Sequence, residues 1–176
     1  MNRIITVSRE FGSGGREFGK RLAEQYVEQL VEKKPVIAFP IHIGRSFYPP
    51  ANPVLEQTKS VVLEQQRIIK ELAEKSDCVI VGRCADYILR EYDPFRFFVY
   101  ADMESKLKRC HRKAPGDEHL TDKELKRKIA LIDKNRAAYY DFWTGGKWGL
   151  KLNYDLCINT THTAIKEIAA ALSKMF

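Results

Sequence analysis

A glycine-rich, arginine-flanked segment, residues 8–21, has the composition of a loop that binds phosphate. It lies between a short apolar run and a helical pattern. Glycines at such a junction let successive backbone N–H groups surround an anion, and the N-terminus of the following helix adds partial positive charge. The residues that we expect to bind phosphate here are Gly12, Ser13, Gly14, Gly15 and Arg16.

This loop departs from the regular phosphate-binding motif G-x-x-x-x-G-K-[ST]. If Gly15 is the last glycine of the motif, then Glu10, Arg16 and Glu17 stand where the motif has glycine, lysine and a hydroxyl residue. Arginine keeps the positive charge of the lysine, but its planar guanidinium group binds phosphate with a different geometry. We therefore expect phosphate binding and treat the ability to catalyse as a separate question.

A second candidate anion site follows the apolar run at residues 78–81, where Gly82 and Arg83 precede another helical pattern. In open parallel sheets, ligands bind beyond the carboxyl ends of the strands, so this turn should share a rim with the glycine-rich loop. Gly82 permits close approach of a ligand. Two arginine-bearing turns on one rim predict two phosphate groups that face each other, as phosphoryl transfer requires. The alternative is an ordinary helix N-terminus with a surface arginine.

Two long helical patterns each have one polar residue within an apolar stripe. Gln65 interrupts the stripe of residues 54–73, and Arg136 interrupts that of residues 122–143. Burying a guanidinium without a partner is costly, so Arg136 must meet either a carboxylate or a ligand anion. Asp133, three residues earlier, can supply that carboxylate, and both alternatives stay open.

A basic helix is expected to begin near Asp102. Lys106, Arg109 and Arg112 repeat every three residues along it and precede a polar turn. Proteins that transfer phosphoryl groups mainly position the reactants and stabilise charge, so arginines on a closing lid have a clear mechanical role. We assign Arg112 to such a lid, near residues 106–125, and expect Lys106 to be a solvated surface residue.

The elements that must position these residues alternate as short apolar runs and longer helical patterns, which is typical of a parallel sheet covered by helices. A capping box at Thr121 and Glu124 indicates where the helix over residues 122–143 begins. The prolines of residues 40–53 predict an irregular connection, with a shortened acceptor-binding region near 40–60. Five strands are predicted, at Ile4–Val7, Val36–Phe39, Cys78–Val81, Phe95–Tyr100 and Asp155–Ile158.

Composition favours one compact domain over residues 1–176, and the net charge of +7 favours anionic ligands. No apolar stretch approaches the roughly 20 residues that cross a bilayer, so we expect a cytosolic protein without a membrane partner. The four cysteines and four histidines are dispersed, which favours free thiols and gives no obvious metal cluster.

Taken together, these segments resemble the cytidylate kinase-like family within the P-loop nucleoside monophosphate kinases. The resemblance implies a doubly wound, five-stranded parallel sheet with helices on both faces and a helical lid. It also implies that ATP, with Mg²⁺, binds at the first loop and that an acceptor monophosphate binds near the Gly-Arg turn. The matching segments are residues 5–16, 79–89, 133–140, 144–149 and 153–156.

The resemblance also assigns roles to residues. Established members have aspartate where Val81 stands, and the hydroxyl expected after the loop lysine is missing, which leaves Ser8, Ser13 or Asp86 as candidates for holding Mg²⁺. The residues assigned to catalysis are Arg16, Arg112 and Arg136. By the resemblance, Arg83 would contact the acceptor phosphate, and Arg109, Arg112 and Arg136 would be lid-side or transition-state arginines. We assign Gly82, Arg83, Gln65 and Arg109 to substrate binding.

The expected function is transfer of the γ-phosphoryl of ATP to a nucleoside monophosphate, CMP-like, or to another small phosphorylated acceptor. The replaced motif residues motivate an alternative, a non-catalytic nucleotide-binding sensor or partner-binding module on the same fold. An RNA-binding domain ranks last, because aromatic residues are not interleaved with the basic patch at 106–113. We therefore do not expect a nucleic-acid partner.

Overall fold

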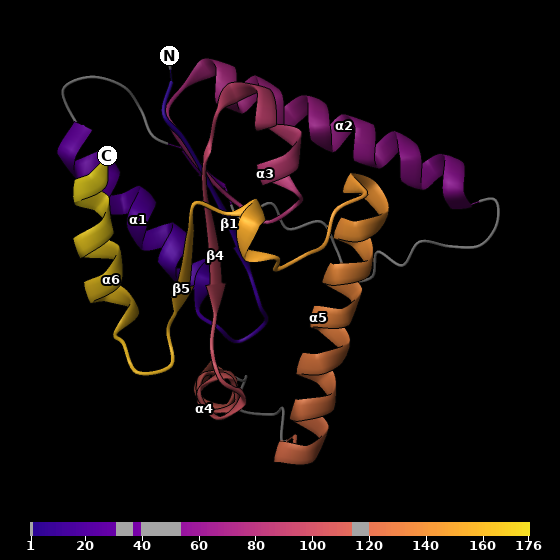
Figure 1. The fold of residues 1–176 in the computed structure, drawn as a ribbon, viewed down its shortest axis with the longest axis vertical. Helices are drawn as coiled ribbons and strands as arrows, with labels where there is room; N and C mark the ends of the chain where they lie inside the picture. The colour runs from indigo at the N-terminus through magenta and orange to yellow at the C-terminus, as the bar shows by residue number, and fades with distance from the viewer. Residues whose placement is uncertain (1, 31–36, 40–53, 114–119) are drawn as a thin grey trace.

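The computed structural model describes residues 2–30, 37–39, 54–113 and 120–176 (Figure 1). The expected irregular connection at 40–53 and most of the expected polar turn of the lid therefore lie outside the described residues. The strands are β1 (Ile4–Arg9), β2 (Ile37–Phe39), β3 (Cys78–Val81), β4 (Phe95–Tyr100) and β5 (Leu156–Asn159). The α-helices are α1 (Gly15–Leu30), α2 (Val54–Lys75), α3 (Ala85–Ile88), α4 (Met103–Lys113), α5 (Asp122–Thr144) and α6 (Ile165–Leu172). Short 3₁₀ turns are η1 (Arg90–Tyr92), η2 (Lys151–Asn153) and η3 (Ser173–Met175).

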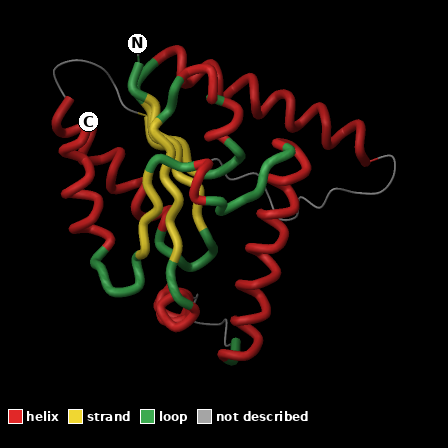
Figure 2. Tube along the Cα trace, viewed as in Figure 1, coloured by secondary structure: helices red, strands yellow, loops and turns green. Residues whose placement is uncertain are grey.

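The strands form one parallel sheet in the order β2-β3-β1-β4-β5. β1 is central: Ile4 lies opposite Cys78 of β3, and Ile5 lies opposite Phe95 of β4. β3 and β4 have the predicted bounds, whereas β1 continues beyond Val7 to Arg9. Because the strands run in one direction, the segments that follow β1 and β3 meet at the same edge of the sheet. Figure 2 shows the strands side by side between the helices.

Helices cover both faces of the sheet, as expected for a doubly wound fold (Figure 1). On one face, Ile5 and Val7 of β1 pack with Phe18 of α1 and with α6. On the other face, Ile4 packs with residues of α2, α3 and α5. Strands that are buried on both faces read as continuous apolar runs, and for this reason the central strands were predictable.

Local capping fixes where α4 and α5 begin. The Asp102 carboxylate accepts a hydrogen bond from the Ser105 N–H at 2.7 Å, just ahead of α4. Thr121 and Glu124 form the predicted capping box, in which each side chain accepts a hydrogen bond from the backbone N–H of the other. These side chains satisfy N–H groups that a helix leaves without partners at its start. α4 then lies beyond the carboxyl end of β4 (Figure 1).

The four cysteines are free thiols, as expected. Within the described part of the chain, no helix is long and apolar enough to cross a membrane.

Gly19 allows α1 to lie close to the sheet, and Gly19→Ala tests this contact. A Cβ at this position would lie 2.6 Å from Cγ2 of Val81. Overpacking of a core costs about 1–3 kcal/mol, whereas alanine in an open helix stabilises by up to ~1 kcal/mol relative to glycine. We expect a net loss of unfolding free energy, measured by urea denaturation. Lys20→Ala, at the exposed neighbouring position, should change it by less than about 0.5 kcal/mol. A Gly19→Ala protein more stable than wild type would contradict the close packing.

Candidate functional site

The glycine-rich loop between β1 and α1 has a backbone that requires glycine. Gly12 and Gly14 have φ values of +75° and +83°. A Cβ on Gly14 would lie 2.1 Å from Cδ1 of Ile165, at the start of α6. The hydroxyl of Thr160, which follows β5, donates a buried hydrogen bond to the Ser13 carbonyl at 2.6 Å. The loop is thus a fixed turn that leads directly into the N-terminus of α1, an arrangement suited to the phosphates of a nucleotide.

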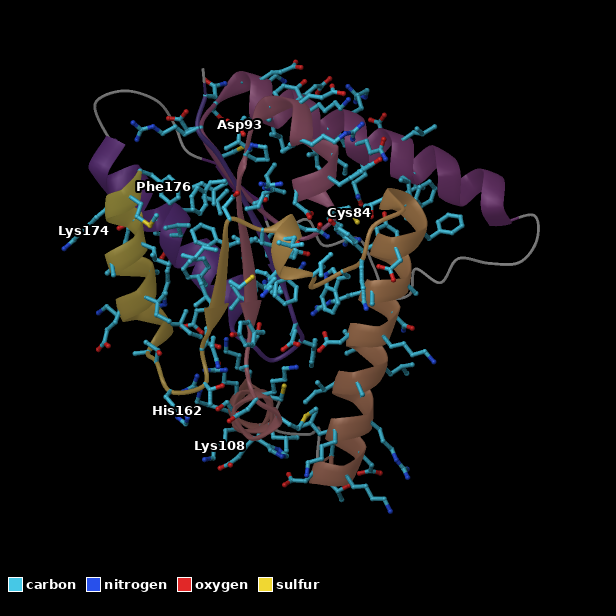
Figure 3. The ribbon with its side chains drawn as sticks, viewed as in Figure 1. Cys84, Asp93, Lys108, His162, Lys174 and Phe176 are labelled. Atoms are coloured by element: carbon cyan, nitrogen blue, oxygen red, sulfur yellow. The ribbon has the colours of Figure 1, made fainter. Side chains whose placement is uncertain are left out.

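The second turn, after β3, has an unusual backbone. Gly82, Arg83 and Cys84 have successive φ values of +80°, +63° and +54°. Such conformations cost non-glycine residues about 1–3 kcal/mol each and cluster at ligand sites. The Gly82 N–H donates to the Val7 carbonyl of β1 at 2.9 Å, so this turn and the glycine-rich loop share a rim, as the sequence predicts. Cys84 lies between α3 and the C-terminal part of α5 (Figure 3).

Arg9, the last residue of β1, is a site residue that the sequence reasoning missed. A Cβ on Gly82 would lie 1.7 Å from Nη1 of Arg9, so the guanidinium lies directly against the second turn. Burial, followed by the like charges of Arg136, Arg83 and Arg16, lowers the pKa of Arg9 to about 9. Three further arginines therefore lie near the Arg9 guanidinium. The signal in the sequence was that Arg9 stands shortly before the first glycine of the loop, Gly12.

Arg136 points inward from α5, as its place in the apolar stripe predicts. Its Nη1 donates to the Arg9 carbonyl at 3.1 Å and to Oδ1 of Asp133 at 3.3 Å. The guanidinium also lies over the ring of Phe11, 5.6 Å from the ring centre. Burial lowers the pKa of Arg136, and the Asp133 carboxylate opposes this shift. Arg136 therefore has a carboxylate partner and also lies near Arg9 and Arg83.

Lys106 is buried, and the expectation of a solvated residue was wrong. It is only 6% exposed, and its Nζ lies 2.7 Å from Oε2 of Glu10 and 3.4 Å from Oδ2 of Asp133. Asp133 also accepts a 2.6 Å hydrogen bond from the Phe11 N–H. Apolar packing of α4 against α5, through Leu107 among others, directs Lys106 toward the loop. These ion pairs hold the glycine-rich loop to both helices.

Gln65 of α2 is buried, with 5% exposure, at the predicted inward position. Its Nε2 has no hydrogen-bond partner among the described residues. The hydroxyl group of Tyr139 lies close to Gln65, and Tyr139 is also near Arg83. Gln65 and Tyr139 therefore place polar groups beside the second turn.

Arg109 does not lie where the acceptor assignment placed it. Its Nη2 donates to the carbonyl of Thr160, and its Nη1 is buried without a partner among the described residues. β5 and β3 lie on opposite sides of β1, so Arg109 is beside the glycine-rich loop and not beside Gly82. Arg112 is exposed, close enough to Arg109 to lower its pKa after the larger effect of burial.

Each candidate magnesium ligand makes a hydrogen bond within the protein, although Oδ1 of Asp86 is buried without a partner among the described residues. Ser13 donates to the Glu10 carbonyl at 2.8 Å, and Asp86 accepts a 2.8 Å hydrogen bond from the Tyr140 hydroxyl. The Ser8 hydroxyl is hydrogen-bonded to Tyr154. No group of three or more metal-ligating side chains is present among the residues that the structure describes. The described site thus presents backbone N–H groups and arginines for an anion, and Ser8, Ser13 and Asp86 stay the candidates for holding Mg²⁺ beside substrate phosphates.

Lys106→Met tests whether the buried ion pairs fix the loop. The change removes the ammonium shared by Glu10 and Asp133. Asp133 keeps Arg136 and the Phe11 N–H, but the partly buried Glu10 loses its ion-pair partner, which costs about 1–3 kcal/mol. We expect a loss of that size in the unfolding free energy, measured by urea denaturation. The control is Lys108→Met: Lys108 points away from the protein body (Figure 3), and its pair with Glu104 is 75% exposed on both sides. The control should change stability by less than about 0.5 kcal/mol, and an equal effect of both changes would contradict the anchoring role.

Asp86 gives a prediction about pH. Burial raises the pKa of this carboxyl group, against the lowering effect of the Tyr140 hydrogen bond. A raised folded-state pKa means that the carboxyl contributes most to stability below about pH 4, the unfolded value, and that this contribution is lost as pH rises. Relative to Asp86→Asn, which does not titrate, wild-type protein should become less stable between pH 4 and pH 7. Urea denaturation at several pH values measures the difference, and a constant difference would contradict the shift.

Solved proteins with similar folds were found by structural comparison. An uncharacterized protein from Eubacterium ventriosum has a similar structure, with a TM-score of 0.74 and 28% identity over 99% of this chain and 98% of that one. Shikimate kinase from Acinetobacter baumannii, solved with shikimate, has a TM-score of 0.52 at 14% identity, over 99% of this chain and 93% of that one. Shikimate kinase from Bacteroides thetaiotaomicron has a TM-score of 0.52 at 17% identity, over 98% and 97%.

At these identities, the two shikimate kinases show the fold alone, which is the α/β fold of the P-loop kinases. No curated protein matches the sequence at a significant level. Residues 45–162 match the cytidylate kinase-like family. Since this match covers more than half of the sequence, the chain belongs to the cytidylate kinase-like family.

Proposed function

We propose that this protein is a kinase that transfers the γ-phosphoryl of ATP to a nucleoside monophosphate, CMP-like, or to another small phosphorylated acceptor. The observation that supports this proposal best is the meeting of two arginine-bearing turns at one rim of the sheet. Gly82 is hydrogen-bonded to the end of β1, and the Arg136 side chain reaches the same place from α5. Two facing anion sites are the arrangement that phosphoryl transfer needs.

On the donor side, the backbone N–H groups of residues 12–15 bind the phosphates of ATP, and Arg16 neutralises them from the first turn of α1. Arg109 belongs to this side, because it lies against Gly14 and the Thr160 carbonyl. Its buried, unpaired Nη1 is available to the nucleotide. These groups hold the donor in place while its terminal phosphorus is attacked.

On the acceptor side, Arg83 orients the acceptor phosphate, with Gly82 and Gln65 beside it. An oxygen of that phosphate bonds to the γ-phosphorus, while the bond from that phosphorus to the bridging oxygen breaks and ADP leaves. Arg136, held by Asp133, stabilises the charge on the transferring group. The attacking oxygen is already an anion, so the scheme needs no side-chain base.

Arg112 belongs to a helical lid in this proposal, since it is exposed near the end of α4. Closure would bring it toward the phosphates and exclude water. Mg²⁺ would enter bound to the ATP phosphates and supply positive charge to them.

The second candidate is a nucleotide-binding sensor without turnover. It is favoured by Arg16 in place of the usual lysine and by the internal hydrogen bonds of Ser13 and Asp86. Binding calorimetry with ATP and CMP, combined with a turnover assay, separates the two candidates. Tight binding without transfer to any acceptor would support the sensor.

A coupled assay with ATP, Mg²⁺ and a panel of nucleoside monophosphates tests the kinase. We expect Arg83→Gln to lower kcat/KM by roughly 100-fold or more, because it removes a donor to the reacting phosphate. Arg90→Gln is the control, since Arg90 is exposed and stacks on the Tyr87 ring, and it should leave kcat/KM within about twofold. Folded wild-type protein that transfers phosphate to no acceptor would refute the kinase proposal.

A further inference from the structure

The side chain of Arg9 reaches from the glycine-rich loop to the second turn. Its stem lies at the loop, where a Cβ on Gly15 would be 2.4 Å from the Arg9 Cβ. Its head lies against the second turn, where a Cβ on Gly82 would be 1.7 Å from Nη1. One side chain thus contacts both candidate anion sites. The proposed function gives this guanidinium no role.

The protein supplies little negative charge to this guanidinium. Among the described residues, no carboxylate forms an ion pair with Arg9, and the Asp133 carboxylate favours its charged form less than burial and three neighbouring arginines oppose it. Asp133 already interacts with Lys106, Arg136 and the Phe11 N–H. The larger electrostatic effects on Arg9 come from cationic groups, namely Arg136, Arg83 and Arg16.

A partly buried cation among like charges is unfavourable unless an anion compensates it. A merely structural role does not account for this placement, since an apolar side chain could fill the space over Gly82 without the cost of desolvation. Arginine instead presents a planar fork that can bind two phosphate oxygens at once. The location between two phosphate sites is where such a fork would serve both.

We propose that Arg9 binds the reacting phosphates of both substrates, so that the site is complete only with a polyphosphate chain or a facing pair of phosphates. The identity of the two substrates rests on the proposed kinase function, whereas the anion binding does not. If Arg9 binds both reacting phosphates, the group of the acceptor that attacks ATP should be a phosphate and not an uncharged hydroxyl.

Arg9→Met tests the proposal, with inorganic tripolyphosphate and inorganic phosphate as probes in binding calorimetry and thermal unfolding. Methionine keeps the apolar stem and removes the charge. Free Arg9→Met protein should unfold about 2–4 °C above wild type, because an unfavourable charge is gone. Its affinity for tripolyphosphate should fall by about tenfold or more, and its affinity for phosphate by less.

The matched control is Arg3→Met, which makes the same change in net charge at an exposed position at the other end of β1. It should alter tripolyphosphate affinity by less than about twofold, because solvent and salt screen distant charges. Equal affinities of the Arg9→Met and Arg3→Met proteins for tripolyphosphate would overturn the proposal. So would an Arg9→Met protein with a lower unfolding temperature and an unchanged ratio of tripolyphosphate to phosphate affinity.

If Arg9→Met does not fold, Arg9→Lys tests whether Arg9 contacts both phosphates. Lysine keeps the charge and loses the fork, so tripolyphosphate affinity should fall more than phosphate affinity. Equal losses for both anions would refute a shared contact. Neither probe requires turnover, so an inactive protein that still shows the Arg9 effect would refute only the kinase, and an active protein without the effect would refute only the role of Arg9.

Discussion

The buried ammonium of Lys106 is the interaction on which the geometry of the candidate site depends. It joins Glu10, which precedes the glycine-rich loop, to Asp133 of α5, and it does so from α4. Asp133 in turn holds the Phe11 N–H and the Arg136 guanidinium. One cation therefore sets the position of the loop relative to the arginine that faces it. Buried ion pairs add little net stability, but they penalise every arrangement in which the charges separate.

The conformation of the glycine-rich loop is thus held by contacts with residues far away in the sequence. A regular phosphate-binding loop needs a glycine at the position of Glu10, and here the carboxylate at that position accepts the Lys106 ammonium and the Ala101 N–H. The motif lysine is replaced by Arg16, and positive charge is spread over further arginines between the two turns. Positive charge near the loop is retained, but it comes from residues of several elements and not from one lysine.

Much of this fold was readable from the sequence, and the reasons are local. The central strands are apolar because both faces are covered, the capping box at Thr121 marks the start of α5, and the glycines of the loop reflect a backbone that needs positive φ. Arg136 was also readable, because a charged residue in an apolar stripe demands a partner. Each of these signals lies within a few residues of the feature that it predicts.

The roles of Lys106 and Arg9 could not be read in this way. The spacing of the basic residues on α4 gives them a shared face, but only the packing of α4 against α5 decides which one is buried. The carboxylates that bind Lys106 are distant in sequence, at positions 10 and 133. In the sequence, Arg9 looks like an ordinary residue at the end of a strand. Its contact with Gly82 arises because β1 pairs in parallel with β3, and no local pattern predicts that contact.

The contact of the glycine-rich loop with the segment after β5 has a consequence for the order of events during synthesis. Thr160 binds the Ser13 carbonyl across 147 positions of sequence, and Ile165 packs against Gly14. The loop is made early, yet its partners leave the ribosome much later. A nascent chain therefore contains the loop well before the segment that packs against it, and the observed contacts of the loop can form only after Thr160 and Ile165 have emerged.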